Sequence, residues 1–263
     1  MTSSGLASRA ISAFLWGTGG GTVRIALQIG AQVVLARLLG PTEYGVFALG
    51  TLVITFSFFF ADFGMAYGLI QKPNIDANDI RFVFTWQIII GAVVTAGVIA
   101  LAGPIASFFD EPRAEDVVRV LAGLCLINAV AAPAMNLLKR ELDYRALQLS
   151  LIASYFVGFL LVGIPLAVAG HGVWALVAAW MVQALLGAAI AYAQVRHPVA
   201  PLLWYAGASS QGRYGGLVLA TNLVNWCLAN MDRALIGRWL STRDLGLYTQ
   251  TYNLLHSPSA SLQ

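Results

Sequence analysis

The chain has 263 residues, of which 59% are hydrophobic and only 10% are charged, with a net charge of +3 and a mean hydropathy of +0.75. Soluble domains carry about 25% charged residues, so this composition excludes an ordinary soluble protein and indicates a membrane protein. The basic residues are scattered over short loops and form no patch interleaved with aromatic residues, which argues against nucleic acid as a partner.

Seven apolar segments follow one another along the chain. Each is long enough to cross the roughly 30 Å hydrocarbon core of a bilayer as a helix. An eighth segment begins near Leu245 and runs into His256 and Pro258. We therefore expect an all-α polytopic membrane protein, and we expect the chain to be a fragment of a longer one. The seven segments are Ser12–Leu38, Tyr44–Ile70, Phe82–Phe108, Val117–Leu138, Leu147–Ala169, Val173–Val195 and Tyr214–Trp239.

A short motif occurs twice, as RLLGPTEYGVF from Arg37 and as RWLSTRDLGLY from Arg238, which is an offset of 201 residues. The alignment matches the acids Glu43 and Asp244 and also matches Gly45 with Gly246, which indicates an internal repeat. Six spans precede the second copy, so the two copies run parallel about an axis along the membrane normal. We expect a six-span N-terminal lobe at 1–212 and the first one or two spans of a second lobe at 213–263.

Lysine and arginine are distributed unequally between the loops on the two sides of the predicted bundle. Because cytoplasmic loops retain the excess of these residues, the sequence predicts a cytoplasmic N-terminus. One side carries Arg9, Lys72, Arg81, Lys139, Arg140, Arg145, Arg196 and Arg213, whereas the other carries Arg37, Arg113, Arg119, Arg238 and Arg243.

Motifs for catalysis, metals and cofactors are not found in the sequence. The run GTGGG at Gly17–Gly21 lies within a span and follows no strand, so it fails the context of a phosphate-binding loop. Gly17 with Gly21, and Gly64 with Gly68, instead predict close helix packing. The three histidines stand apart at span ends, and no HExxH or CxxC occurs. We expect no enzyme activity, no cofactor and no metal.

Ionisable residues inside the spans are the most informative, because a charge near the bilayer centre usually needs a partner or a water-filled cavity. Arg24, Gln28 and Gln32 recur every four residues and form one polar stripe. The offset of 201 places Arg24 on Asn225 and Gln32 on Arg233. Two matching polar faces predict a shared central cavity. Its expected lining is Arg24, Gln28, Gln32, Asp62, Asn222, Asn225, Asp232 and Arg233.

A purely structural role is the alternative for these residues, each contributing about 1 kcal/mol through hydrogen bonds within the bundle. Arg24 and Asp62 are expected at depths that differ by roughly 8 Å at 1.5 Å per residue, so they form a candidate neutralising pair. If the sequence is a fragment, spans seven and eight lack the other helices of the second lobe to which they belong. Asp232, Arg233, Tyr248, Gln250 and Asn253 are therefore expected to be poorly satisfied.

Three stretches, ARLLGPTEYGVFALG, FADFGMAYGLIQ and MDRALIGRWLSTRDLGLYTQTYNLL, resemble the N-terminal part of bacterial oligosaccharide flippases, the Wzx-like polysaccharide transporters. Multidrug antiporters and the lipid II flippase belong to the same superfamily. The resemblance covers nearly the whole chain. It implies two lobes in the inner membrane that move a polyprenyl-diphosphate-linked oligosaccharide by alternating access, without hydrolysing it.

Three functions remain open on the sequence. In a flippase for lipid-linked glycans, Arg24 and Arg233 suit a diphosphate, and the amide side chains suit sugar hydroxyls. In a multidrug antiporter, Asp62 or Asp232 would exchange protons or sodium, although the arginines would repel cationic drugs. A membrane glycosyltransferase or polysaccharide polymerase is the third, and the short loops argue against it.

Overall fold

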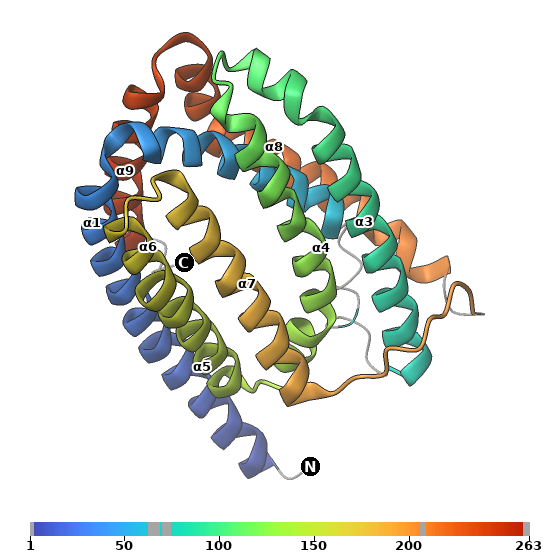
Figure 1. Ribbon diagram of the computed structural model, residues 1–263. Coiled ribbons are helices and arrows are strands. Elements are labelled where there is room, and N and C mark those ends of the chain that lie inside the picture. Colours follow the sequence, from blue (N-terminus) through green and yellow to red (C-terminus); the bar gives the residue numbers. More distant parts are fainter. Residues whose placement is uncertain (1–2, 63–68, 70–74, 206–208, 260–263) are drawn as a thin grey trace.

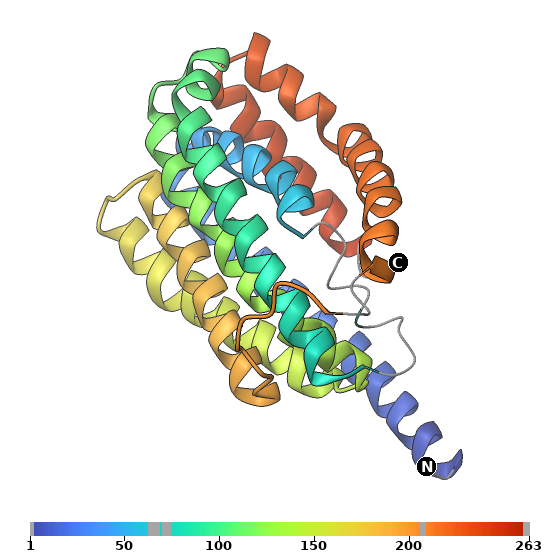
Figure 2. The ribbon, with the colours of Figure 1, turned by 90° about the vertical axis from the view of Figure 1, so that its right-hand side faces the viewer.

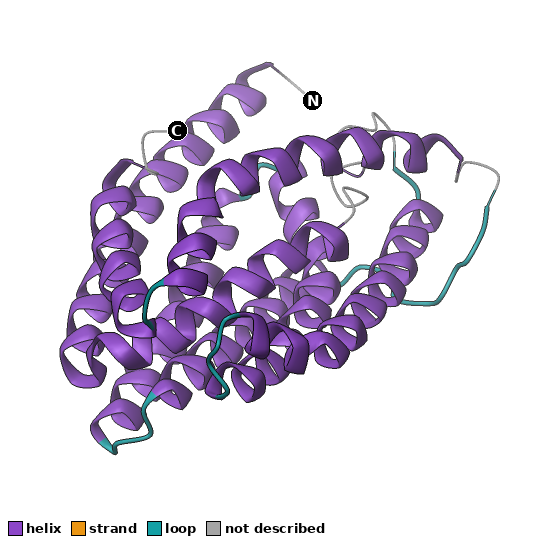
Figure 3. Cartoon of the chain, turned by 90° about the horizontal axis from the view of Figure 1, so that it is seen from above, coloured by secondary structure: helices purple, strands orange, loops and turns teal. Residues whose placement is uncertain are grey.

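The computed structural model describes residues 3–62, 69, 75–205 and 209–259, and the side chains of residues 12, 14–61, 69, 75–205 and 223–253. Within these ranges all regular secondary structure is helical (Figure 3), which confirms the predicted all-α class. The helices are α1 (Ser3–Asp62), α3 (Ala77–Phe108), α4 (Arg113–Arg140), α5 (Tyr144–Tyr155), the π-helical η1 (Phe156–Gly163), α6 (Ile164–Val168), α7 (Val173–Val195), α8 (Ser209–Trp239) and α9 (Thr242–Ser259).

Helix α1 contains two of the predicted spans. Its apolar part, Phe14–Ala61, has 48 residues. A straight helix of that size would be about 72 Å long, more than twice the hydrocarbon thickness. Gly40 breaks it, with φ 76° and ψ 172°, and Pro41 begins the next helix at a position that needs no N–H donor. Figure 1 shows the change of direction in blue. The predicted end of this span at Ile70 lies outside the described residues.

Four further helical segments have the length and hydropathy to cross a membrane: Ala77–Phe108, Arg113–Arg140, Tyr144–Val168 and Val173–Val195. Three of them begin several residues before the predicted apolar cores because polar residues complete their first turns. Asp76 and Asp79, for example, form a capping box at the start of α3. Helices α8 and α9 coincide with the predicted seventh and eighth segments. In the described part of the chain, neither α8 nor α9 is among the helices whose length and hydropathy suffice to cross a membrane.

The main core joins α1, α3, α4 and α7 through apolar side chains that include Ile54, Ala102, Leu121 and Val177. Helix α4 contacts the other three. Helices α8 and α9 lie on one flank of this bundle, as Figure 2 shows. Helix α9 packs mainly against α1, so the contact between the bundle and the C-terminal part of the chain runs through that pair.

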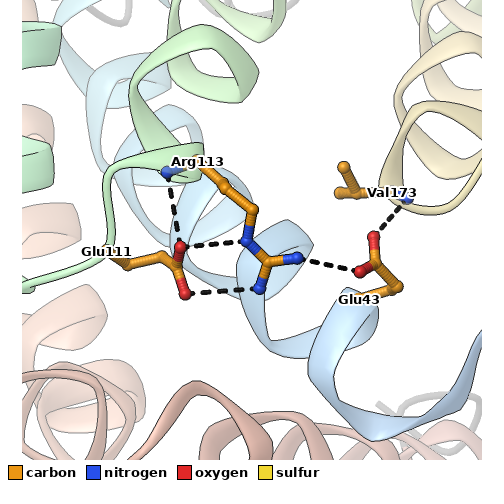
Figure 4. Close-up of polar contacts among 4 residues, drawn as sticks. All are labelled: Glu43, Glu111, Arg113 and Val173. Carbon is orange, nitrogen blue, oxygen red and sulfur yellow. Dashed lines mark hydrogen bonds and ion pairs between the residues drawn. The ribbon is translucent and has the colours of Figure 1, made fainter.

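A polar network ties three connections together at one end of the bundle (Figure 4). Glu43 accepts a hydrogen bond of 2.7 Å from the backbone N–H of Val173, the first residue of α7, through its Oε2. Its Oε1 lies 2.9 Å from Nη1 of Arg113, the first residue of α4, and Arg113 also pairs with Glu111. The ends of α1, α4 and α7 are thereby fixed relative to one another.

The connection between α7 and α8 lies along the start of α3 at the opposite end. Arg81 donates through its Nε to the carbonyl of Ala200 at 2.9 Å, and the indole of Trp86 donates to the carbonyl of Leu203 at 3.0 Å. The backbone N–H of Leu202 donates to the Thr85 hydroxyl. These contacts and the Glu43 network confirm that alternate loops gather at two ends of the bundle.

Candidate functional site

The two copies of the repeated motif lie against each other. A Cβ atom on Gly45 would overlap the carbonyl oxygen of Thr242, and a Cβ atom on Gly246 would overlap that of Pro41. Pro41 and Thr242 are also related by the 201-residue offset. The two contacts are therefore equivalent: the glycine of each copy lies against the first helical residues of the other copy. Both contacts lie at helix starts, which places the two helices side by side and beginning at the same end of the bundle.

A cavity of about 340 Å³ extends from this contact between α1, α5 with η1, α7, and α8 with α9. Aromatic rings of Tyr44, Phe47, Tyr155, Phe159 and Trp180 form much of its wall. Its polar lining is Gln28, Gln32, Thr51, Thr55, Gln183, Arg233, Thr249 and Asn253. A smaller cavity of about 150 Å³ adjoins it and shares Thr51, Thr55, Arg233 and Thr249.

Arg233 supplies the positive charge of this cavity. Its guanidinium lies 4.3 Å from the ring centre of Tyr252 and hydrogen-bonds weakly to Asn230 at 3.5 Å and Asn253 at 3.4 Å. Its Nε is buried without a hydrogen-bond partner. These long contacts leave donor capacity for an anion, and a guanidinium presents several donors in a planar fork that matches phosphate oxygens.

The predicted site residues are only partly brought together. Gln28, Gln32 and Arg233 line the same cavity, as the repeat predicts. Arg24 is half-buried and does not line it, and its Nε is buried without a partner. Eight residues rotate a helix by about 80° beyond full turns, so the stripe from Arg24 to Gln32 leaves the cavity face.

The remaining predicted residues do not line the cavity or fall outside the described side chains. Asn225 is exposed. Asp232 accepts hydrogen bonds from the Tyr248 hydroxyl and from the backbone N–H of Arg233. The side chains of Asp62 and Asn222 lie outside the described set, and so does the predicted pair of Arg24 with Asp62.

The expectation that polar groups of α8 and α9 are poorly satisfied is wrong for Asp232 and Tyr248, which bond to each other, and for Asn253, which accepts from Arg233. It holds for Nε of Arg233 and for Nε2 of Gln250, which are buried without a hydrogen-bond partner. The two helices therefore satisfy much of their polar surface between themselves.

Close helix packing at the N-terminus also differs from the prediction. A Cβ atom on Gly20 would lie 2.8 Å from Cβ of Gln148, so Gly20 makes the close contact with α5. A Cβ atom on Gly17 would make only an ordinary contact with Tyr144, and one on Gly21 would meet no described atom of another helix within 4 Å. The predicted Gly17 and Gly21 pair is wrong because it lies on a neighbouring face of the helix. Gly64 and Gly68 lie outside the described residues.

Sequence reasoning missed several lining residues and a second polar cavity. Gln183 is the amide in the otherwise apolar centre of α7, and Thr51 and Thr55 stand one turn apart on α1; these were the available signals. The second cavity, of about 270 Å³, lies between α1, α3 and α4 and is lined by Gln87, Asn128, Asn136 and Lys139 among others. In the described part of the chain no group of three or more His, Cys, Asp or Glu side chains could hold a metal ion.

Known proteins similar to this chain come from polysaccharide biosynthesis. The succinoglycan biosynthesis transport protein ExoT of Rhizobium meliloti is 22% identical over 244 residues, covering 93% of this chain and 49% of the relative. The lipopolysaccharide biosynthesis protein WzxC of Escherichia coli is 21% identical over 263 residues, covering 98% and 52%. The teichuronic acid biosynthesis protein TuaB of Bacillus subtilis is 26% identical over 238 residues, covering 88% and 48%.

The chain thus spans about half the length of the curated relatives it matches. No solved structure matches it. A family model described as polysaccharide biosynthesis protein matches residues 34–263, which include both copies of the repeat and every helix from α3 to α9. This multi-pass membrane protein belongs to the polysaccharide biosynthesis protein family.

Proposed function

We propose that the chain is the N-terminal part of a transporter that moves a polyprenyl-diphosphate-linked oligosaccharide across the bacterial inner membrane by alternating access. The observation that carries this proposal is the cavity at the repeat contact, where Arg233 lies beside amide side chains and aromatic rings. The names of the relatives, one of them a transport protein for succinoglycan biosynthesis, support a polysaccharide precursor as the substrate.

The chemistry of the cavity matches the two polar parts of such a substrate. A guanidinium in a site of low dielectric binds a diphosphate through charge-assisted hydrogen bonds. Gln28, Gln32 and Gln183 offer both donors and acceptors to sugar hydroxyls.

The architecture of the proposed transporter has two parallel lobes, 1–212 and a second that begins at 213, with the N-terminus in the cytoplasm. In this arrangement the backbone contact through Gly45 and Gly246 lies at the external end and closes the cavity there. Separation of the two lobes at this contact would open the external side.

Arg233→Ala in the native protein tests the proposal. Loss of hydrogen bonds to a charged group weakens binding by about 1.5–3 kcal/mol, so we expect at least a roughly tenfold loss of export in a strain that depends on the transporter. Arg37→Ala is the matched control, because Arg37 is an exposed arginine of α1 that lines neither this cavity nor its smaller neighbour. Equal export by the two variants at equal abundance would refute the proposal.

Arg24 is proposed as a second cation for the diphosphate, reached when the lobes move, because its Nε is buried without a partner. We expect Arg24→Ala to abolish export while protein abundance stays near normal. A fall in abundance with unchanged export per molecule would instead assign Arg24 a structural role.

Proton or sodium coupling through a carboxylate is a further part of the proposal. Asp232 lies next to Arg233 and is held by Tyr248. If it carries the coupling ion, Asp232→Asn keeps a hydrogen-bonding side chain but makes export insensitive to collapse of the ion gradient. Export by this variant that remains as sensitive as in the native protein would exclude Asp232 from coupling.

A further inference from the structure

An apolar groove of about 400 Å³ runs between α1, α3 and α8. Its volume falls within the roughly 300–1,000 Å³ range of ligand pockets. Its walls include Leu52 and Phe56 of α1, Leu101 and Phe108 of α3, and Trp226 and Ala234 of α8. No ionisable side chain takes part in its described lining, unlike that of the cavity around Arg233.

The groove opens on the outer surface of the bundle. Leu101 and Phe108 are 56% and 55% exposed, and the most apolar window of α3 is only 17% buried inside the protein. Because α3 has the length and hydropathy of a membrane span, this surface faces hydrocarbon. An apolar chain can therefore enter the groove from the bilayer without crossing water.

Two side chains, Leu52 and Trp226, line both the groove and the small polar cavity, and Trp226 offers a polar group to one side and an apolar ring to the other. Trp226 lines the groove and also the small cavity that contains Arg233. Its indole N–H donates to the Thr55 hydroxyl at 3.3 Å, on the polar side, and its ring lies 4.8 Å from that of Phe56, on the apolar side. Tryptophan suits such a boundary, because it has a large apolar ring and a single donor.

Helix α8 has two chemically distinct faces at this point. Arg233 belongs to the polar cavity, and the next residue, Ala234, lines the apolar groove. A ligand that contacts both residues must be charged at one end and apolar at the other. A lipid carrying a diphosphate has this composition.

We propose that the groove binds the isoprenoid chain of the lipid-linked substrate while its diphosphate and sugars lie in the polar cavity, with the Trp226 indole at the junction. This inference rests on the proposed function, since that function supplies the head group. It adds a binding site for the isoprenoid chain of the lipid. That isoprenoid chain moves through hydrocarbon along α3 and α8 as the head group crosses between the lobes.

Photocrosslinking tests the groove separately from transport. The photoreactive residue p-benzoylphenylalanine replaces Phe108 in the groove, or Ile99 as a control that is exposed on α3 and does not line the groove. The probe is an alkyne-tagged long-chain polyprenol without a head group, added to membranes that contain phosphatidylethanolamine. We expect severalfold more labelling at position 108, competed by untagged polyprenol and not by added phosphatidylethanolamine. Equal labelling at the two positions, or equal competition by the phospholipid, overturns the inference.

A groove-filling variant links binding to export. Ala234→Phe places a ring in the groove, and Leu235→Phe places the same ring at the adjacent, exposed position, which does not line the groove. We expect the first to lose the labelling at position 108 and most of the export, and the second to keep both. Export that depends on Arg233 but survives Ala234→Phe, with no selective labelling at 108, would refute the groove alone. Selective labelling with export that ignores Arg233 would refute the proposed function alone.

Discussion

The two copies of the repeated motif begin a helix at the same end of the molecule but use their equivalent acids differently. In the first copy the helix begins at Gly40 and Pro41, and Glu43 reaches across to α4 and α7. In the second copy Ser241 and Asp244 form a closed capping box. The backbone N–H of Asp244 donates to the Ser241 hydroxyl at 3.2 Å, and the Asp244 carboxylate accepts from both the backbone N–H and the hydroxyl of Ser241.

The difference follows from what each helix start must hold. Proline at the first helical position needs no cap for its own nitrogen and presets the backbone, so the acid of the first copy is available to neighbouring helices. The second start has no proline and satisfies its first turn locally. The same position of a repeat thus fixes a bundle in one copy and a single helix end in the other.

The largest effect is expected from the glycines that the copies share as a contact. Gly45→Ala or Gly246→Ala places a methyl group on a backbone oxygen, which cannot move aside as a side chain can. Overpacking of this kind costs about 1–3 kcal/mol, so we expect α9 to separate from α1 and the melting temperature in detergent to fall. Gly30→Ala is the control, because a Cβ atom there meets no atom within 4 Å. Equal stability of all three variants would mean that the copies do not touch in the membrane.

The second prediction separates the two acids. Glu43→Ala removes a charged acceptor from the first N–H of α7 and also the ion pair with Arg113, so we expect a loss of about 1–3 kcal/mol. Arg113→Ala removes only partly exposed pairs and should cost about 0.2–1 kcal/mol. Unfolding of the purified variants in detergent measures both. If Arg113→Ala lost as much stability as Glu43→Ala, the stabilisation by Glu43 would come from its ion pair with Arg113 and not from its hydrogen bond to the N-terminus of α7.

Much of the fold was predictable from the sequence because hydropathy specifies spans directly. Apolar runs predicted the five segments that are long and apolar enough to cross a membrane in the described part of the chain, one of which, Phe14–Ala61, joins two predicted spans. The repeat aligned Gln32 with Arg233, and both line one cavity. The π-helical segment η1 was not predictable, since an apolar run carries no signal for its hydrogen-bond register. Arg24 does not line the cavity with Gln32 because the eight residues between them rotate the helix by about 80° beyond full turns.

The candidate site was less predictable than the fold because a threonine that lines a cavity cannot be told in the sequence from one that bonds within its own helix. Thr55 donates to the carbonyl of Thr51 at 2.8 Å, so threonine in a membrane helix is satisfied without any cavity. Its contact with Trp226 joins residues 171 positions apart and leaves no trace in the local pattern. The groove beside it consists of apolar residues that sequence analysis assigns to ordinary spans.

The third prediction concerns the capping box of the second copy. Ser241→Ala removes the side-chain acceptor at the N-cap and should destabilise the start of α9 by about 1 kcal/mol. Thr42→Ala is the control in the first copy, because Thr42 is exposed and the contacts of Glu43 run to Arg113 and Val173. Hydrogen exchange of the first amides of α9 should rise in the first variant only. Unchanged exchange would show that the box contributes nothing to α9.

The smallest effect is a dependence of the α9 start on pH. Hydrogen bonds from the hydroxyl and the backbone of Ser241 lower the pKa of Asp244, so the folded helix end binds its proton less readily than the unfolded chain does. Stability from this contact is therefore fully present above the ordinary aspartate pKa of about 3.9 and is lost as pH falls through the lower folded value. Glu43 lies in a different network, so the first copy offers no equivalent of this local hydroxyl contact. We expect amide exchange at the start of α9, corrected for its intrinsic pH dependence, to accelerate below about pH 4 in the native protein. This dependence should weaken in Ser241→Ala, which removes the hydroxyl but keeps the backbone N–H donor to Asp244. An undiminished dependence in Ser241→Ala would show that the Ser241 hydroxyl does not set the acid sensitivity and would remove the local capping box as the distinction between the two copies.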